Sequence, residues 1–176
     1  MEKSPKSIGA TYGVYLGVFM ILLTVLAYAF SLELFTKWWY GIFSFLVLLV
    51  VSILAVRNAK KHKISYFSFK NAFTTYFITV FVGMLIATAF SILLFTVIDT
   101  EAAQVVNEKT IEASRSMMER FGAPEAEINK ALAEMESNNQ FSVGNQLKRF
   151  VYSLGFYLVI GLIIALIFKE RNPDKV

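Results

Sequence analysis

Four long segments without a charged side chain set the main limit on how this chain can fold. They cover residues 7–32, 38–56, 71–98 and 150–168, and they are 26, 19, 28 and 19 residues long. A helix needs about 20 apolar residues to cross the hydrocarbon core of a bilayer. The segments do not alternate as barrel strands do, and a helix satisfies its backbone hydrogen bonds internally. We therefore predict an all-α integral membrane four-helix bundle, with helices at about 8–32, 38–56, 71–98 and 148–168 in a single domain covering 1–176.

The first charge-free segment shares two features with a secretory signal peptide. It follows a mildly basic N-terminus and contains Ala-Tyr-Ala at 27–29, which resembles a signal-peptidase site. The apolar region of a signal peptide is about 7–15 residues long, and this segment is longer. We expect the helix to be retained, and a cleaved signal is the alternative.

Lysine and arginine residues are divided unevenly between the two ends of the predicted bundle. The N-terminus, the 57–70 linker and the C-terminal tail hold ten cations and three anions, whereas the 33–37 linker and segment 99–149 hold seven cations and ten anions. Cytoplasmic loops of membrane proteins are enriched in lysine and arginine. We therefore expect both termini in the cytoplasm. The net charge of +4 then reflects membrane topology, and we expect no nucleic-acid binding.

Small residues recur at four-residue spacing in three of the predicted membrane helices. Such stripes let helix backbones approach closely in lipid, where packing drives helix association. They serve either the bundle itself or a homo-oligomer, and the sequence does not choose between these. The predicted helix-packing residues are Gly9, Gly13 and Gly17 in the first helix, Gly83, Ala87 and Ser91 in the third, and Gly161 and Ala165 in the fourth.

A charged, helix-prone segment at 101–136 separates the third and fourth membrane helices. Gly122 is typical of the position after a helix end, and Pro124 is typical of the first position of the next helix. We predict an extracytoplasmic amphipathic helical hairpin. Its apolar stripes either pack on each other or the outer leaflet, or they dock a partner helix. The predicted partner-facing residues are Met117, Phe121, Ile128, Leu132 and Met135.

Several chemical functions are disfavoured by what the chain lacks. It has no cysteine, and its single histidine, His62, lies in a lysine-rich turn, which excludes thiolate and histidine metal clusters. No ionisable residue lies inside the four charge-free segments, although proton relays and ion paths use such residues. Phosphate-binding and nucleophile-elbow motifs are also missing. We expect a non-enzymatic protein without a cofactor.

Three stretches carry a resemblance to a known family. They are ISYFSFKNAF at 64–73, MMERFGAPEAEINKALAEME at 117–136, and FSVGNQLKRFVYSLGFYLVIGLIIALIFKERNP at 141–173. Together they resemble an uncharacterised domain-of-unknown-function family of four-helix membrane proteins from Bacteroidota. The resemblance implies four membrane spans in a bacterial inner membrane. It brings no activity, substrate or cofactor.

The leading functional hypothesis is an interaction or structural subunit that presents residues 101–136 to a partner. Its expected partners are the lipid bilayer and either a second membrane protein or another copy of the chain. The alternative is a small transporter or channel-forming oligomer lined by hydroxyls of the third helix, such as Thr79, Thr88 and Ser91. A signal or stress sensor is a third possibility, with no sequence feature of its own beyond the hairpin.

Overall fold

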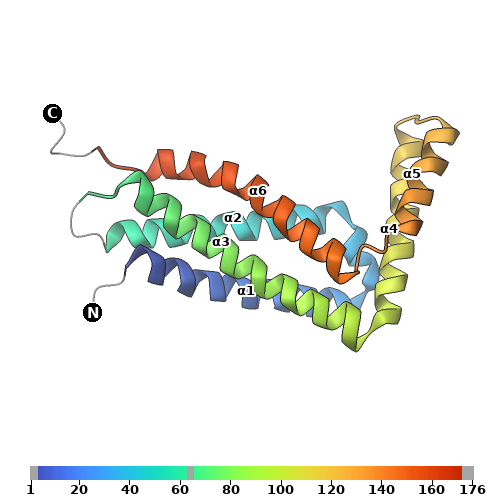
Figure 1. The fold of residues 1–176 in the computed structure, drawn as a ribbon, viewed down its shortest axis with the longest axis horizontal. Helices are drawn as coiled ribbons and strands as arrows, with labels where there is room; N and C mark the ends of the chain where they lie inside the picture. Colours follow the sequence, from blue (N-terminus) through green and yellow to red (C-terminus); the bar gives the residue numbers. More distant parts are fainter. Residues whose placement is uncertain (1–3, 63–65, 172–176) are drawn as a thin grey trace.

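The computed structural model describes residues 4–62 and 66–171, and its secondary structure is helical throughout that part of the chain. Four helices are long and apolar enough to cross a membrane. They are α1 (Pro5–Phe30), α2 (Trp38–Lys61), α3 (Phe69–Ile92), which continues into the π-helix η2 (Leu93–Ile98), and α6 (Val143–Phe168). They lie side by side, with the start of α1 and the end of α6 at the same end of the bundle (Figure 1). The predicted all-α four-helix membrane bundle is confirmed.

Serine side chains determine where the membrane helices begin. Ser4, Ser68 and Ser142 each accept a hydrogen bond from the backbone N–H three residues later, and so cap α1, α3 and α6. Such caps satisfy an N–H group that has no partner within the helix. The cap at Ser142 explains why α6 begins at Val143, five residues before the predicted start at 148.

The ends of two membrane helices also differ from the prediction. α1 ends at Phe30 instead of 32, because Ser31 adopts an extended conformation (φ −168°, ψ 122°) and starts the short 3₁₀ helix η1 (Leu32–Thr36). α2 continues beyond 56 to Lys61. Charge ends an apolar segment but does not end a helix, since lysine and arginine are good helix formers.

Close contact between α1 and α3 forms the centre of the bundle, and α3 also contacts α2 and α6. The three glycines of the first stripe all lie at this contact. A Cβ atom at Gly9 would lie 2.8 Å from the carbonyl oxygen of Thr75. At Gly13 and Gly17 it would lie 2.7 Å from the Cβ atoms of Val82 and Ile86, respectively. The contact therefore requires residues without a side chain on α1.

The other small residues take different positions. Gly83 faces Leu16 of α1, where an added Cβ would lie 2.6 Å from Leu16 Cδ2. Gly161 faces the ring of Tyr76 at the same distance, and Ala165 is fully buried. Ala87 and Ser91, by contrast, line a cavity described below. The stripe on α3 is therefore a close-packing surface only at Gly83.

The outward faces of the bundle carry large apolar side chains. Examples from the four long helices are Leu22, Leu46, Leu85 and Ile167, whose side chains are 48% to 70% exposed. Large exposed apolar surfaces of this kind are rare on soluble monomers. Together with the lengths of the helices, they identify a multi-pass membrane protein.

A hairpin of two shorter helices, α4 (Thr100–Arg120) and α5 (Glu125–Ser137), crosses the end of the bundle where α3 ends and α6 begins, and it projects past α6 (Figure 1). At the bend, Gly122 has φ +72°, and the N–H groups of Gly122 and Ala123 donate to the carbonyls of Glu119 and Met118 at 3.0 Å. This is the glycine helix stop expected from the sequence. Pro124 precedes α5 as its N-cap and is not its first helical residue, a shift of one position from the prediction.

Candidate functional site

A second apolar cluster packs the base of the hairpin against the end of the bundle. Partly buried side chains of α1, η1 and α3 complete it, including Tyr28 and Phe35. Because the cluster joins segments from both halves of the chain, the base of α4 has a defined position. Its buried members are Leu94 and Phe95 of η2, Ala102, Ala103 and Val106 of α4, and Phe141 between α5 and α6.

Asp99 connects the start of α4 to α1. Its carboxylate accepts hydrogen bonds from the N–H of Ala102 at 2.8 Å and from the hydroxyl of Tyr28 at 2.7 Å. Both bonds favour the ionised carboxylate. The Ala102 N–H, followed by the Tyr28 hydroxyl, therefore holds the pKa of Asp99 below its ordinary value. The helix cap of α4 is thus also a contact between two distant parts of the chain.

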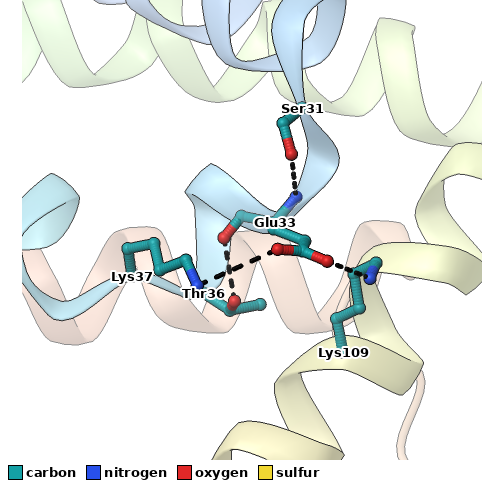
Figure 2. Close-up of polar contacts among 5 residues, drawn as sticks. All are labelled: Ser31, Glu33, Thr36, Lys37 and Lys109. Atoms are coloured by element: carbon teal, nitrogen blue, oxygen red, sulfur yellow. Dashed lines mark hydrogen bonds and ion pairs between the residues drawn. The ribbon is translucent and has the colours of Figure 1, made fainter.

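An ion pair connects α4 to the linker between α1 and α2. Figure 2 shows the carboxylate of Glu33 with Lys109 Nζ at 2.8 Å on one side and Lys37 Nζ at 3.9 Å on the other. Glu33 is itself held by Ser31, whose hydroxyl accepts from its N–H, and by Thr36, whose hydroxyl donates to its carbonyl. The hydrogen bond from Lys109 lowers the pKa of Glu33, and the same bond raises the pKa of Lys109.

The chain between α5 and α6 is fastened to the bundle as well. The carbonyl of Phe141 accepts hydrogen bonds from the hydroxyl of Thr96 at 3.2 Å and from Nε2 of Gln146 at 2.8 Å. Gln140 donates to the hydroxyl of Thr110 at 3.1 Å. Both ends of the hairpin are therefore anchored, and only its far end projects freely.

Within the hairpin, α5 packs on α4. Ile128 and Leu132 are each 3% exposed, and Met135 is half-buried. The structure therefore corrects the prediction that Ile128 and Leu132 face a partner. The sequence pattern identified their apolar stripe, but α4 covers it because the two helices are antiparallel neighbours.

Two predicted partner-facing residues remain uncovered, Met117 and Phe121, which are 58% and 84% exposed. They extend the face of α4 that meets the bundle at Ala103 and Val106, because residues three or four positions apart share one face of a helix. Thr110 and Ala113 lie between them on this face. One face of α4 is thus buried against the bundle at the base of the helix, and its far end, which is still apolar, is exposed.

The opposite face of α4 is charged along its whole length. Residues at matching helical spacing there are Glu101, Glu108, Glu112, Arg115 and Glu119, and all five are exposed. A helix with one charged face and one apolar face is typical of a boundary between water and a less polar phase.

A partly open cavity of about 270 Å³ lies between the four long helices near the hairpin. Its walls come from all four long helices, and Met20, Leu48 and Met84 supply apolar surface. Two residues of the predicted α3 stripe, Ala87 and Ser91, contribute to it. Its polar lining consists of Thr24, Thr88, Ser91, Gln146, Arg149 and Ser153.

The hydroxyls of α3 that were predicted to line a path fall into two groups. Thr88 and Ser91 lie at this cavity. Thr79 does not, because it is fully buried and its hydroxyl donates to the carbonyls of Gly9 at 3.2 Å and Thr75 at 2.8 Å. The structure thus brings together only part of the predicted set.

No cluster of three or more histidine or acidic side chains in the described residues has an arrangement that would hold a metal ion. A model of the family described as "Protein of unknown function (DUF4199)" matches residues 11–170. The chain belongs to the DUF4199 family. The match to DUF4199 covers nearly all of the bundle and the whole hairpin. No curated protein and no solved structure matches the chain significantly.

Three features of this DUF4199 protein were missed by sequence reasoning. The pair Glu33–Lys109 and the pair Tyr28–Asp99 join residues 76 and 71 positions apart, which no local pattern reveals. Arg149 was counted only as a topology charge. Its place directly before an apolar segment was the available signal, because ionisable residues at such positions often serve a function.

Proposed function

We propose that this DUF4199 protein is a non-enzymatic subunit of the bacterial inner membrane that holds a neighbouring membrane protein beneath its hairpin. Both termini are assigned to the cytoplasm and the hairpin to the outer side. The unequal distribution of lysine and arginine supports this orientation, because the basic N-terminus, 57–70 linker and tail all belong to one end of the bundle.

The exposed apolar face at Met117 and Phe121 is the observation that carries the proposal. This face continues the one that packs on the bundle, so it is directed toward the membrane side of the hairpin. The hairpin projects past α6 (Figure 1), which leaves a corner between the side of the bundle and the overhanging end of α4. A membrane protein that lies beside α6 would contact Met117 and Phe121 through the extracytoplasmic end of its own membrane helices.

The fixed base of the hairpin supports the same function. The apolar cluster, the Asp99 cap and the Glu33–Lys109 pair hold α4 in one position. A rigid element loses less conformational entropy when it binds a partner than a flexible one does. A transporter receives less support, because Thr79 is buried and uses its hydroxyl within the bundle.

The test places a photo-crosslinking amino acid at Phe121 in living cells. Arg115, on the charged face of the same helix, is the matched control position. We expect a light-dependent protein adduct from position 121 and none from position 115. Adducts with lipid alone, or equal protein adducts at both positions, would refute the proposal.

The orientation is tested separately, and the absence of cysteine makes this simple. Single cysteines are introduced by Arg115→Cys and Lys61→Cys. A membrane-impermeant maleimide should label the first in intact cells and the second only after the cells are permeabilised. The reverse pattern would invert the proposed topology.

A further inference from the structure

The fully buried serine and threonine hydroxyls of the bundle bond to the backbone of their own helix. Ser52, Thr75 and Thr79 each donate to the carbonyl four residues earlier, at 2.7, 2.9 and 2.8 Å. This is the usual way in which a membrane helix accommodates serine and threonine. These three hydroxyls therefore have no donor left for a ligand.

Three hydroxyls at the cavity behave differently, whereas the hydroxyl of Thr24, which also lines it, donates to the carbonyl of Met20 at 2.9 Å. Thr88, Ser91 and Ser153 all line the cavity, and within the described part of the chain none of them makes a hydrogen bond to another residue. Each hydroxyl offers one donor and two acceptor positions. Three such groups from α3 and α6 therefore border one partly open cavity with their hydrogen-bonding capacity free.

Arg149 adds a positive charge to the same space. One nitrogen of its guanidinium donates to Oε1 of Gln140 at 3.1 Å. A guanidinium has five N–H donors, so several remain available. No acidic side chain among the described residues forms an ion pair with it. An arginine that borders a membrane cavity without an acidic partner is suited to bind an anion.

We propose that this cavity binds a phosphate group, with Arg149 pairing its charge and the three hydroxyls donating to its oxygens. A phosphate has more acceptor oxygens than a carboxylate and so matches a larger number of donors. Arg149 directly precedes the 19-residue charge-free segment 150–168, which spans roughly the thickness of the hydrocarbon core. It therefore lies at the level of lipid headgroups.

The source of the phosphate is either a lipid headgroup or a soluble phosphate ion or ester. The cavity volume of about 270 Å³ is just below the usual range of ligand pockets. It suits a headgroup better than an entire lipid, whose acyl chains would remain in the bilayer. This site involves the bundle and does not depend on the function proposed for the hairpin.

The test measures binding to the purified full chain in dodecyl maltoside by the rise in its thermal unfolding midpoint. Dioleoylphosphatidylglycerol, inorganic phosphate and dioleoylglycerol, which lacks phosphate, are titrated in turn. Arg149→Gln removes the proposed charge, and Lys148→Gln removes the neighbouring charge, which does not line the cavity, as a matched control. A midpoint measured without ligand shows whether each variant is folded.

We expect phosphatidylglycerol to bind, and dioleoylglycerol not to. Arg149→Gln should weaken the apparent affinity by about tenfold or more, the usual effect of losing a charged hydrogen-bond partner, whereas Lys148→Gln should change it by about twofold at most. If inorganic phosphate binds with the same dependence on Arg149, the site accepts soluble phosphate as well. The lipid is the source if only phosphatidylglycerol binds.

Three results would overturn the proposal. They are equal binding of dioleoylglycerol, equal losses in Arg149→Gln and Lys148→Gln, and no binding of either phosphate probe. The double variant with Ser91→Ala and Ser153→Ala keeps all charges and serves if Arg149→Gln does not fold. It should weaken binding several-fold, and unchanged affinity in it would contradict the role of the hydroxyls.

Discussion

Replacement of Gly13 by alanine should destabilise the bundle, because α3 already occupies the space of the new methyl group. The added Cβ would lie 2.7 Å from Val82 Cβ and 3.0 Å from the carbonyl oxygen of Thr79. Non-bonded carbon atoms at rest are about 3.5–4.0 Å apart. The backbone fixes the position of both atoms, so a change of rotamer at Val82 does not relieve the overlap, and the two helices must separate locally by about 1 Å.

The expected cost has two parts. Overpacking of this kind costs about 1–3 kcal/mol. Separation of the helices also breaks the hydrogen bond from Thr79 to the carbonyl of Gly9, which is already 3.2 Å long. Hydrogen bonds between membrane helices contribute about 0.6 kcal/mol on average. We therefore expect Gly13→Ala to lower the free energy of unfolding by about 1.5–3.5 kcal/mol.

Equilibrium unfolding in mixed detergent and dodecyl sulfate micelles measures this change. Gly155→Ala in α6 is the matched control, since a Cβ there would meet no atom within 4 Å. We expect the control to stay within about 0.5 kcal/mol of the parent protein, as surface substitutions usually do. If Gly13→Ala is as stable as Gly155→Ala, α1 and α3 do not approach each other as closely at Gly13 as the structure has it, and the expected destabilisation is refuted. Gly13→Leu should lower the free energy of unfolding more than Gly13→Ala does.

Three further predictions concern the hairpin. Ile128→Asp places an unpaired charge in the buried interior of the hairpin, so hydrogen exchange should become faster throughout α4 and α5. Lys130→Asp, on the exposed side of α5, is the control and should leave exchange unchanged. Equal exchange rates in the two variants would contradict the packing of α5 on α4. Gly122→Ala puts a side chain on a residue with φ +72°, which should lower the stability of the hairpin by about 1 kcal/mol. Hydrogen exchange at the bend should then become faster. Unchanged exchange there would argue against the glycine helix stop. The lowered pKa of Glu33 means that its pairing with Lys109 contributes stability above the ordinary pKa of glutamate, near 4.3, and loses it as pH falls through the lowered value. The protection of the base of α4 against hydrogen exchange, taken relative to the intrinsic exchange rate at each pH, should therefore fall in acid. Glu33→Gln should reduce this dependence without abolishing it, since the pKa of Asp99 is lowered as well.

The bundle was predictable because its signal is local and strong. A charge-free segment long enough to span a bilayer has few structural alternatives. The boundaries were less predictable, because the segments end at charges whereas helices end at caps. Lys60 and Lys61 remain in α2, and α6 begins at Val143, well before its apolar part, because Ser142 caps it there. The turn at Gly122 was predictable because left-handed backbone strongly favours glycine.

The hairpin surface was predicted only in part. The spacing of Ile128 and Leu132 identified an apolar face correctly, but spacing does not say what covers a face. Met117 and Phe121 have the same kind of spacing and the opposite exposure. The cavity could not be predicted, because its lining depends on how α3 and α6 are rotated about their axes. That rotation is set by contacts such as the one between Gly161 and Tyr76.

The central position of α3 has a consequence for how the protein is made. Its partners α1 and α2 are synthesised before it, and its third partner, α6, follows after the 44 residues of segment 99–142. At about 5–20 residues per second, translation of that segment takes about 2–9 s. The glycine contacts of α1 thus have time to form before the last helix enters the membrane. Arrival of α6 then closes the phosphate cavity and brings Phe141 to the base of the hairpin, so the two proposed functional surfaces mature in one late step of biogenesis.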